Sequence, residues 1–426
     1  MEKIRIAIVG AGSRGADCYG QALLEMKDRA QVVAVAEPRA DRRNAIADAH
    51  GVPEGNRFET GEALLARPKL ADAMLICTQD RQHVRQAVAA MRLGYDLLME
   101  KPISPVAEEL REIVRVQRET GRKVVVCHVL RYTPFYRKIK QVIDSGAIGE
   151  VVAIQALENV QYWHQAHSFV RGNWRNAELS SPMIMQKCCH DLDYLVWLSG
   201  QRCERVTSFG SLKHFRPECA PAGAAMRCTA GCAAKESCPY DAEKIYLTNP
   251  NTGVLSGAKG WPCDVLALNP TEESIRAAIE TGPYGRCVYH CDNDVVDHQV
   301  VDMLMENGAT LTLTMSAFTS VGGRSICVMG TRGDIRGDLE ANTIRIGPFG
   351  QPAETVDVRA LSDDFSGHAG GDKQLLRQFL DLLSGKEADG NMSTLEASVE
   401  SHLVALAAEE SRLNGGQSIE IAPMRG

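Results

Sequence analysis

Three glycines near the start of the chain form a pattern that could hold a phosphate group. Gly10, Gly12 and Gly15 follow a short apolar segment at 4–9 in the spacing G-x-G-x-x-G. The first glycine allows a tight turn, the second lets the backbone approach a pyrophosphate, and the third lets the next helix pack closely. A helix starting near Ser13 would direct its N–H groups and positive dipole end at the anion. The segment therefore predicts a dinucleotide-binding turn, with a plain glycine turn as the alternative.

An acidic residue stands where a dinucleotide site would need one. A second apolar segment, 31–36, ends at Glu37, about twenty residues after the glycine turn. A carboxylate there can accept hydrogen bonds from the ribose 2′-hydroxyl of NAD, and it would repel the 2′-phosphate of NADP. Arg39, Arg42 and Arg43 follow and keep NADP open as the alternative. We expect NAD to be the cofactor.

Composition and charge exclude several classes of protein. The 426 residues are 44% hydrophobic and 24% charged, as in an ordinary globular protein, and are enough for two domains. The net charge of −7 argues against a nucleic-acid partner. No apolar run approaches the roughly 20 residues that a membrane span needs. A core segment beginning by Ile4 leaves no room for a signal peptide, so we expect a cytoplasmic protein whose 14 cysteines are reduced.

Strand-like and helix-like segments alternate through the first 125 residues. Segments at 4–9, 31–36, 72–77, 95–99 and 122–127 predict strands, and segments at 14–27, 39–50, 80–93 and 105–120 predict helices. Such alternation predicts a doubly wound parallel sheet with its ligands at the carboxyl ends of the strands. We therefore expect a Rossmann-type NAD(P)-binding domain over residues 1–125.

The remaining residues, 126–426, follow a different pattern. Helices are expected at 134–145, 187–198, 371–384 and 394–413, and strands at 150–157, 333–347 and 354–358. Segments at 293–306, 308–318 and 323–331 predict neighbouring strands of a mainly antiparallel sheet, with Asn307-Gly308 as a hairpin turn. The cysteine-bearing stretch at about 213–292 is irregular and looks inserted. We expect a C-terminal α+β domain with a large open sheet.

Motifs along the chain identify a family resemblance. They are Val9-Gly-Ala-Gly-Ser-Arg-Gly15, the Thr78–His83 segment, Glu100-Lys101-Pro102, Arg131-Tyr-Thr-Pro134, 146–151 and His190-x-x-Asp193. The chain resembles the glucose–fructose oxidoreductase/inositol dehydrogenase (Gfo/Idh/MocA) family over nearly all of its length. The resemblance implies a Rossmann domain, a C-terminal domain for substrate and oligomer contacts, and therefore a homo-oligomer (dimer or tetramer). It implies cofactor contacts from Gly10, Gly12, Ser13, Arg14, Gly15, Glu37, Thr78, His83, Glu100 and Lys101.

Lys101 and His190 are the expected catalytic residues. By resemblance, Lys101 lies between nicotinamide and the substrate hydroxyl, where burial would make it a usable proton relay; a solvent-facing lysine paired with Glu100 is the alternative. His190 could take the hydroxyl proton as hydride leaves the same carbon, unless it is a capping or core histidine. Asp193 lies one helical turn further on and could orient the His190 ring.

The chain departs from the family pattern at one position near His190. Inositol-dehydrogenase-like members have Asp four residues before this histidine, and some relatives have Tyr, whereas this chain has Gln186 followed by Lys187. An amide can form hydrogen bonds but does not usefully accept a proton. We therefore expect His190 or Lys101 to carry more of the proton transfer, with Gln186 and Lys187 beside them.

The stretch 161–175 concentrates aromatic, histidine and arginine side chains. It holds Trp163, His164, His167, Arg171, Trp174 and Arg175 in a chain with only 5% aromatic residues. Tryptophan faces stack on sugar rings and an arginine fork suits a carboxylate, sulfonate or phosphate, although a subunit interface also favours these residues. With Lys187 nearby, they predict an anionic sugar as substrate. The same cleft is expected to contain His128, Arg131, Tyr132, His190 and Asp193.

Four cysteines in the inserted stretch are spaced like metal ligands. Cys219, Cys228, Cys232 and Cys238 follow the pattern C-x8-C-x3-C-x5-C. Four thiolates suit a tetrahedral Zn²⁺, which would order a stretch poor in core-forming residues. The spacing is not that of a standard zinc ribbon, so an iron–sulfur cluster or no metal are the alternatives. Cys263, Cys287 or Cys291 could replace Cys219 as the fourth ligand.

These residues together predict an NAD-dependent oxidoreductase that moves hydride between a sugar or polyol and nicotinamide. The alternative is an NAD-dependent glycoside hydrolase, which oxidises a sugar carbon transiently, eliminates the aglycone, adds water and reduces the carbon again with tightly bound NAD. A non-catalytic NAD sensor is a third interpretation. The pairing of Lys101 with His190 argues against that third interpretation.

Overall fold

The chain begins with a six-stranded parallel sheet, as its alternating pattern predicts. In the computed structural model, which describes residues 2–387 and 390–425, the strand order is β3-β2-β1-β4-β5-β6. The strands are β1 (Ile4–Val9), β2 (Ala30–Ala36), β3 (Arg57–Phe58), β4 (Ala73–Ile76), β5 (Asp96–Met99) and β6 (Val124–Val126). Their apolar side chains are buried on both faces of the sheet, as expected for a covered parallel sheet. The order reverses at β1 and β4, where ligands bind in such folds.

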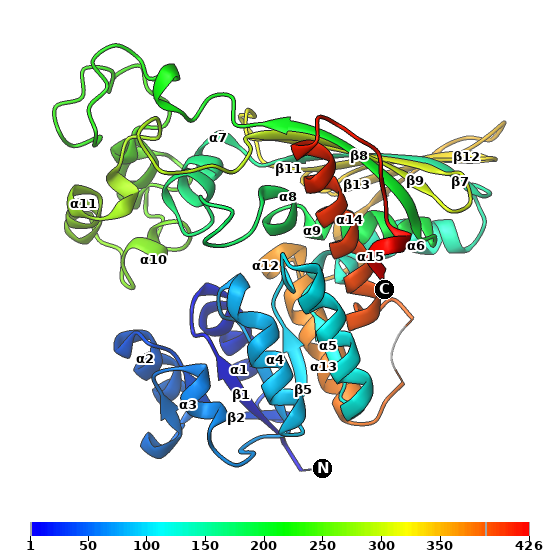
Figure 1. Ribbon diagram of the computed structural model, residues 1–426, viewed down its shortest axis with the longest axis horizontal. Coiled ribbons are helices and arrows are strands. Elements are labelled where there is room, and N and C mark those ends of the chain that lie inside the picture. Colours follow the sequence, from blue (N-terminus) through cyan, green and yellow to red (C-terminus); the bar gives the residue numbers. More distant parts are fainter. Residues whose placement is uncertain (1, 388–389, 426) are drawn as a thin grey trace.

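Helices cover both faces of this sheet (Figure 1). They are a π-helical segment (Ser13–Gly20) continued by α1 (Gln21–Glu25), then α2 (Ala40–His50), α3 (Gly61–Leu65), α4 (His83–Arg92) and α5 (Ala107–Thr120). α5 buries Leu110, Ile113 and Val116, which share one helical face, and ends at Gly121 in the left-handed region (φ +64°). The helix predicted over 14–27 is therefore π-helical in its first half and ends at Glu25.

A nine-stranded sheet forms the second half of the fold. Its order is β14-β13-β12-β11-β7-β10-β9-β8-β15. The strands are β7 (Val151–Asn159), β8 (Cys203–Ser211), β9 (His298–Met305), β10 (Thr310–Ser316), β11 (Gly323–Gly330), β12 (Gly333–Asp338), β13 (Thr343–Pro348), β14 (Glu354–Asp357) and β15 (Ile419–Glu420). The sheet is mainly antiparallel, as predicted, with β10 and β7 as its parallel pair.

The predicted strand neighbours in the second sheet are correct for one pair of strands and wrong for the next pair. β9 and β10 form a hairpin through Asn307-Gly308, with Gly308 at φ +86°. β10 and β11 are not neighbours, because β7 lies between them. A hairpin turn is encoded locally by Asn-Gly, whereas the connection 317–322 is long enough to pass over one intervening strand, a step of about 10 Å.

One face of the second sheet is covered by helices and the other is open. α6 (Pro134–Asp144), α8 (Met183–Gln186), α9 (Cys189–Ser199) and α14 (Leu395–Leu413) lie below the sheet in Figure 1. Along β7, Ile154 and Ala156 are buried, whereas Gln155 and Leu157 alternate with them and are exposed. The chain ends in the short helix α15 (Ala422–Arg425).

The late helices return to the first sheet. α12 (Ser366–Ala369) precedes α13 (Gly371–Leu383), and Leu375 and Phe379 of α13 belong to the same buried apolar cluster as Ile6 and Ile8 of β1. α13 thus covers one face of the parallel sheet, although it lies far beyond residue 125. Within the described residues, no helix combines the length and apolar character needed to cross a membrane.

The stretch 213–292 has more structure than its composition indicates. α10 (Cys263–Leu266), α11 (Glu272–Thr281) and a π-helical turn (Lys244–Thr248) pack around an apolar core of their own that includes Phe215, Tyr246 and Ile275. α11 starts with a capping box between Thr271 and Ser274. Figure 1 shows this inserted unit projecting beyond one end of the second sheet. The expectation of an irregular stretch is therefore only partly correct.

Candidate active site

The glycine turn after β1 has the geometry that a phosphate-binding turn needs. Gly10 adopts φ +88°, and a Cβ at this position would lie 2.4 Å from the Cys77 carbonyl oxygen. A Cβ on Gly15 would lie 1.9 Å from the Gly10 oxygen, so the helical segment can lie this close to the turn only with glycine at position 15. A Cβ on Gly12 would meet nothing closer than the Arg39 guanidinium, at 3.7 Å. Gly12 is thus not required by the protein's own packing, which leaves space beside its partly exposed backbone for a ligand.

Glu37 at the end of β2 is fixed beside this turn. Its side chain is buried, Oε2 accepts a hydrogen bond from the Ala11 N–H (2.9 Å), and Oε1 accepts one from Arg39 Nε (2.8 Å). Arg43 donates to the Glu37 carbonyl (2.6 Å), whereas Arg42 turns away to Asp17 (3.2 Å). Two of the three arginines that kept NADP open therefore adjoin Glu37.

His83 joins the two loops that follow β4 and β5. Its ring nitrogens lie 2.7 Å from the Pro102 carbonyl and 3.0 Å from the Thr78 carbonyl, and its side chain is buried. The Thr78 hydroxyl donates to Gln86 Oε1 (2.8 Å). His83 thus holds Thr78 and the Lys101-Pro102 segment, through the Pro102 carbonyl, at the same edge of the sheet. Both were expected near the cofactor, and this edge is where a dinucleotide binds in a doubly wound sheet.

Arg14 and Glu100 are tied together inside this edge. Arg14 Nε lies 2.6 Å from Glu100 Oε1, and its Nη2 donates to Asp372 at the start of α13 (2.7 Å) and to the Tyr19 hydroxyl (2.6 Å). Burial alone would raise the pKa of Glu100, but the Arg14 guanidinium and the Lys101 ammonium lower it below its usual value. The carboxylate therefore stays charged, and Asp372 was not expected to take part.

Lys101 reaches from the first sheet to the helices of the second. Its Nζ donates to the Gln186 carbonyl at the end of α8 (3.0 Å). Two residues on, the Ile103 N–H donates to His402 Nε2 (2.8 Å), and the other nitrogen of His402 lies 2.7 Å from the Ser398 carbonyl. Burial lowers the pKa of His402 to about 3, so the ring is neutral and can accept from Ile103. His402 was not expected in the site, since a single histidine within an apolar helix carries no distinctive spacing.

His190 at the start of α9 is a buried, neutral histidine. Burial lowers its pKa well below the usual value, and the Lys101 ammonium lowers it further. Its ring centre lies 5.9 Å from that of His128 and 6.0 Å from that of His368. Its Nδ1 has no hydrogen-bond partner among the described residues. The structure therefore brings a neutral imidazole close to the Lys101 ammonium.

Asp193 does not orient His190, and that expectation is corrected. Its two oxygens accept bonds from Arg131 Nε (2.6 Å) and Nη2 (2.7 Å), and His128 Nε2 lies 3.7 Å from Oδ1. The loop carrying Arg131 precedes α6 and packs against α9, so this arginine rather than the ring one turn earlier takes the carboxylate. Asp193 and Arg131 form a buried ion pair below the site.

Gln186 and Lys187 contact different partners, although they are neighbours in the sequence. The backbone carbonyl of Gln186 contacts Lys101, as described above. Lys187 Nζ pairs with Glu158 of β7 (3.1 Å), and Arg324 of β11 pairs with the same Glu158 (2.7 Å) and with Asp191 (2.7 Å). Arg324 is a component of the site that the sequence did not single out, because a lone arginine in a strand usually faces solvent.

Part of the aromatic stretch contacts the inserted unit rather than an open cleft. Trp163 and His164 in α7 (Tyr162–His164) pack against Trp261 of the insert, with ring centres 5.0 Å and 4.7 Å away. His164 is also close enough to Lys187 for that ammonium to act on it: burial lowers the pKa of His164 well below its usual value, and the Lys187 charge lowers it further. Trp174 is half-buried and lies 6.3 Å from Phe169 between ring centres.

Three residues expected to bind substrate are used by the fold instead. His167 is buried, its Nδ1 lies 2.9 Å from the Tyr246 hydroxyl, and it stacks on Tyr284. Arg171 is only 1% exposed and donates to the Arg286 and Tyr240 carbonyls, both at 2.7 Å. Tyr132 shares a hydrogen bond with Ser393 (2.9 Å). The corrections at His167 and Arg171 have one cause: side chains of this type also pack well against a neighbouring unit, here the insert. Arg175 likewise pairs with Asp292 of the insert (2.8 Å).

The predicted zinc ligands are not assembled as predicted. Cys219 Sγ donates to the Lys213 carbonyl (3.4 Å), whereas Cys228, Cys232 and Cys238 lie around a cavity elsewhere in the insert. Across the described part of the chain, no group of three or more His, Cys, Asp or Glu side chains is spaced to hold a metal ion. The set that includes Cys219 is therefore corrected.

Two family profiles cover most of the chain. An oxidoreductase family with an NAD-binding Rossmann fold matches residues 4–128, and the C-terminal α/β domain of the oxidoreductase family matches residues 140–421. The chain belongs to this Gfo/Idh/MocA family. Its first part is an NAD-binding domain, and the protein is an oxidoreductase, which confirms the predictions of fold class and general function.

Sequence relatives carry related names. The chain is 25% identical over 354 residues to YteT of Bacillus subtilis, whose name describes an oxidoreductase; the match covers 79% of this chain and 77% of that protein. It is 28% identical over 207 residues to an inositol 2-dehydrogenase of Corynebacterium glutamicum, covering 48% of this chain and 57% of that enzyme. The chain thus matches little more than half the length of the named dehydrogenase.

Solved structures share the whole fold. An oxidoreductase from Agrobacterium radiobacter in complex with NAD⁺, L-tartaric acid and magnesium superposes with a TM-score of 0.69 at 16% identity, covering 99% of this chain and 100% of that one. The WlbA dehydrogenase from Bordetella pertussis, in complex with NADH and UDP-GlcNAcA, gives a TM-score of 0.70 at 18% identity, covering 98% of each chain. At these identities the likeness establishes the fold alone.

Proposed function

We propose that the protein is an NAD-dependent dehydrogenase that oxidises a hydroxyl-bearing carbon of a sugar, polyol or sugar acid. The observation that carries the proposal is the approach of Lys101 to the end of α8, beside the neutral ring of His190. One group can donate a hydrogen bond and the other can accept a proton. Oxidation of an alcohol needs a group that takes the hydroxyl proton, and a hydrogen-bond donor beside it stabilises the charge that develops on the oxygen.

Bound NAD⁺ would supply the hydride acceptor for this reaction. The residues that fit it are the open backbone at Gly12, which would take the pyrophosphate, and Glu37, which would take the ribose hydroxyls. Glu37 already holds Arg39, so its carboxylate is fixed in place and would repel a 2′-phosphate. NAD is therefore preferred to NADP in this proposal.

His190 and Lys101 divide the proton chemistry. As the substrate carbon loses hydride, its hydroxyl must lose a proton, and the neutral ring of His190 is the group proposed to accept it. The Lys101 ammonium can donate a hydrogen bond to the same oxygen and stabilise its developing negative charge. The Gln186 carbonyl and the loop fixed by His402 keep the ammonium in place. Gln186 thus acts through its backbone, and its amide need not carry a proton.

One cation at the site supports an anionic substrate. Lys187 and Arg324 pair with Glu158 and Asp191, whereas Lys101 Nζ donates to the Gln186 carbonyl and forms no ion pair with a carboxylate among the described residues. The two solved relatives described above hold a tartaric acid and a nucleotide sugar acid. We infer that a carboxylate-bearing sugar or polyol is the substrate class, with His164 and Lys187 beside its acid group.

The names of the sequence relatives favour net oxidation over the glycoside hydrolase alternative.

A homo-oligomer is also proposed, because Val152 and Leu157 expose apolar surface on the open face of the second sheet. Light scattering of the purified protein would test this. Residence in the cytoplasm stays a prediction from the sequence.

The dehydrogenase proposal is tested by mixing the protein with NAD⁺ or NADP⁺ and panels of sugars, polyols and sugar acids, and following NADH absorbance. We expect NADH from a sugar acid or polyol, and a loss of kcat of about 100-fold or more in Lys101→Ala and His190→Asn. Lys123→Ala is the matched control, because Lys123 Nζ donates to the Leu382 carbonyl at the opposite edge of the sheet. Full activity in both site variants, or aglycone release from aryl glycosides without NADH, would refute the proposal.

A further inference from the structure

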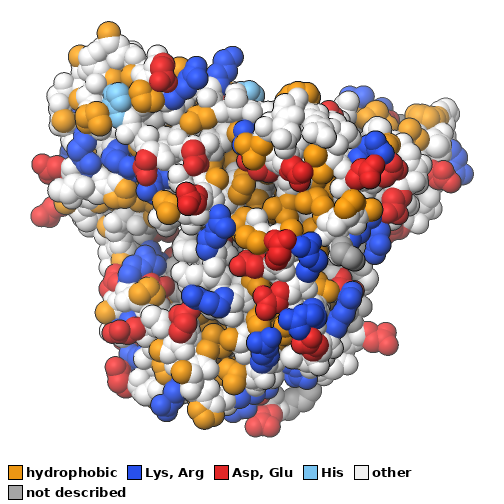
Figure 2. Space-filling view, viewed as in Figure 1, with side chains coloured by type: hydrophobic (Ala, Val, Ile, Leu, Met, Phe, Trp, Pro, Cys, Tyr) orange, Lys and Arg blue, Asp and Glu red, His pale blue; other side chains and the backbone are white. Residues whose placement is uncertain are grey.

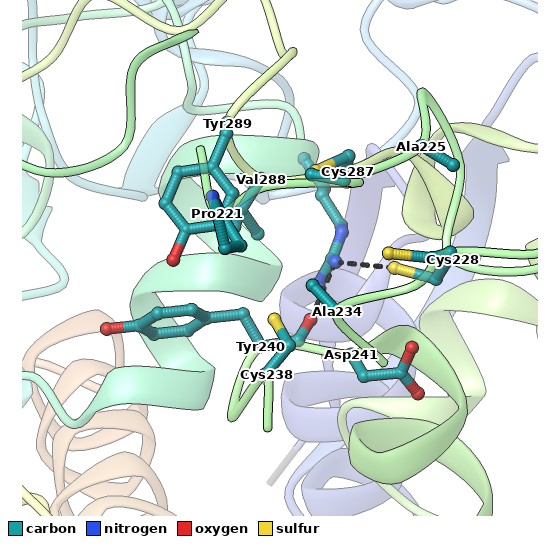
Figure 3. A pocket seen from close by; sticks show the side chains of 13 residues that line it. Pro221, Ala225, Cys228, Ala234, Cys238, Tyr240, Asp241, Cys287, Val288 and Tyr289 are labelled. Atoms are coloured by element: carbon teal, nitrogen blue, oxygen red, sulfur yellow. Dashed lines mark hydrogen bonds between the residues drawn. The ribbon is translucent and has the colours of Figure 1, made fainter. Parts of the chain in front are cut away.

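A small cavity in the inserted unit is surrounded by cysteine side chains. Its volume is about 20 Å³, and its walls include Cys228, Cys232, Cys238 and Cys287 (Figure 3). Three of these cysteines come from one loop, and Cys287 comes from the segment after α11. An isolated backbone bridge between Arg227 and Arg286 holds the two segments side by side. The tertiary structure therefore brings the thiol of Cys287 to the cavity that the three cysteines of this loop also line.

The side chain of Arg171 lies against the same cavity. It is buried, Nη2 lies 3.5 Å from Cys228 Sγ, and Nη1 has no hydrogen-bond partner among the described residues. The one carboxylate on the cavity wall, Asp241, accepts the Lys244 N–H (3.0 Å) and forms no described ion pair with Arg171. An arginine is always charged, and a buried charge requires a compensating one. The groups placed to supply negative charge are the cysteines, which lose their protons when they bind a metal ion.

We propose that Cys228, Cys232, Cys238 and Cys287 bind one Zn²⁺ ion as a structural site. On binding, four S–H bonds break, four Zn–S bonds form and four protons leave to solvent, with no change of oxidation state. The resulting complex has a charge of −2, which the Arg171 guanidinium partly balances and to which its free Nη1 can donate. Cys287 thus takes the place of Cys219, whose thiol donates to the Lys213 carbonyl.

The size of the cavity and the state of the loop agree with a single ion. A volume of about 20 Å³ is room for about one water-sized particle, which suits one ion and not a multi-iron cluster. As the described side chains stand, no three ligand groups are spaced to hold an ion, so the thiols must turn toward the cavity centre when metal binds. Residues 220–240 contain no helix or strand, and a metal would order a loop of this kind.

The test is metal analysis of the full-length protein, purified without a polyhistidine tag. Zinc, iron and acid-labile sulfide are measured in the wild type, in Cys228→Ser/Cys287→Ser and in Cys219→Ser as the matched control. We expect one zinc ion per chain in the wild type and in Cys219→Ser, and none in the double variant. Replacement of the zinc by Co²⁺ should give the strong visible absorption of tetrahedral cobalt thiolate in the wild type, a readout that does not depend on enzymatic activity or on the folding of a variant.

Three results would overturn the proposal. They are a wild type without zinc after purification and zinc reconstitution, iron with stoichiometric sulfide in place of zinc, and equal loss of zinc from Cys219→Ser and from the double variant. Arg171→Met tests the charge argument separately. This variant should lose zinc to EDTA faster than the wild type, and an unchanged rate would remove Arg171 from the site. None of these outcomes bears on the dehydrogenase proposal.

Discussion

Gly12 and Gly15 stand three residues apart in the same turn, yet we expect opposite consequences from an alanine at each. Gly12→Ala should weaken NAD binding and leave folding unchanged. Gly15→Ala should destabilise the protein even without cofactor. The pair therefore separates the ligand-binding role of the turn from its packing role.

The expected magnitudes follow from the space around each glycine. A Cβ on Gly15 would lie 1.9 Å from the Gly10 carbonyl oxygen, a backbone atom that cannot move aside alone, so overpacking should cost about 1–3 kcal/mol of unfolding free energy. A Cβ on Gly12 would lie 3.7 Å from Arg39, and its φ of −76° is open to alanine. In Gly12→Ala the poorer helix cap should lower the unfolding free energy by about 0.5–1 kcal/mol. The stiffer unfolded chain should raise it by about 0.4–1 kcal/mol, so the two effects nearly cancel.

The methyl group of Gly12→Ala would instead hold a pyrophosphate away from the backbone amides. We expect NAD to bind at least about tenfold more weakly, or about 1.4 kcal/mol. Calorimetric titration with NAD⁺ measures the affinity, and denaturant unfolding of the cofactor-free protein measures the stability of both variants. Unchanged NAD affinity in Gly12→Ala would refute the placement of the phosphate. Equal destabilisation of the two variants would refute the argument that Gly15 is packed tightly and that Gly12 is not.

Three further outcomes are expected. Arg131→Met leaves the buried Asp193 carboxylate without its partner, so denaturant unfolding should show a loss of about 3–5 kcal/mol; wild-type stability would mean that the pair contributes little. Burial lowers the pKa of His402 to about 3, so the stability linked to this ring is complete above about pH 6.5 and is lost as the pH falls toward 3; His402→Asn should flatten the acid side of the unfolding profile, and an unaltered profile would contradict the assignment. Glu37→Ser frees Arg39 from its carboxylate, so the NADP-to-NAD ratio of kcat/KM should rise at least about tenfold, and a fall would place the ribose elsewhere.

Figure 2 bears on the prediction that the protein has no nucleic-acid partner. Lys and Arg side chains alternate with Asp and Glu over the face in view, and no continuous basic surface crosses it. Nucleic-acid binding needs such a surface, because phosphate neutralisation supplies much of its affinity. The visible face thus agrees with the net charge of −7.

The sequence alone determined the features that depend on neighbours along the chain. The glycine turn, Glu37 at the end of the second strand and the Asn307-Gly308 hairpin are short-range patterns, and the structure contains all three. Period and length of the apolar segments also determined the parallel sheet and most helix bounds. These patterns suffice because backbone dihedrals and the burial of one face are set within a few residues.

Only the tertiary structure decided which side chains meet across long separations. It paired Asp193 with Arg131 rather than His190, turned Arg171 into the insert, and brought His402 under the Lys101 loop. It also placed Cys287, not Cys219, beside the other cysteines. A polar side chain takes whichever partner packing brings within reach, and that partner has no fixed offset in the sequence.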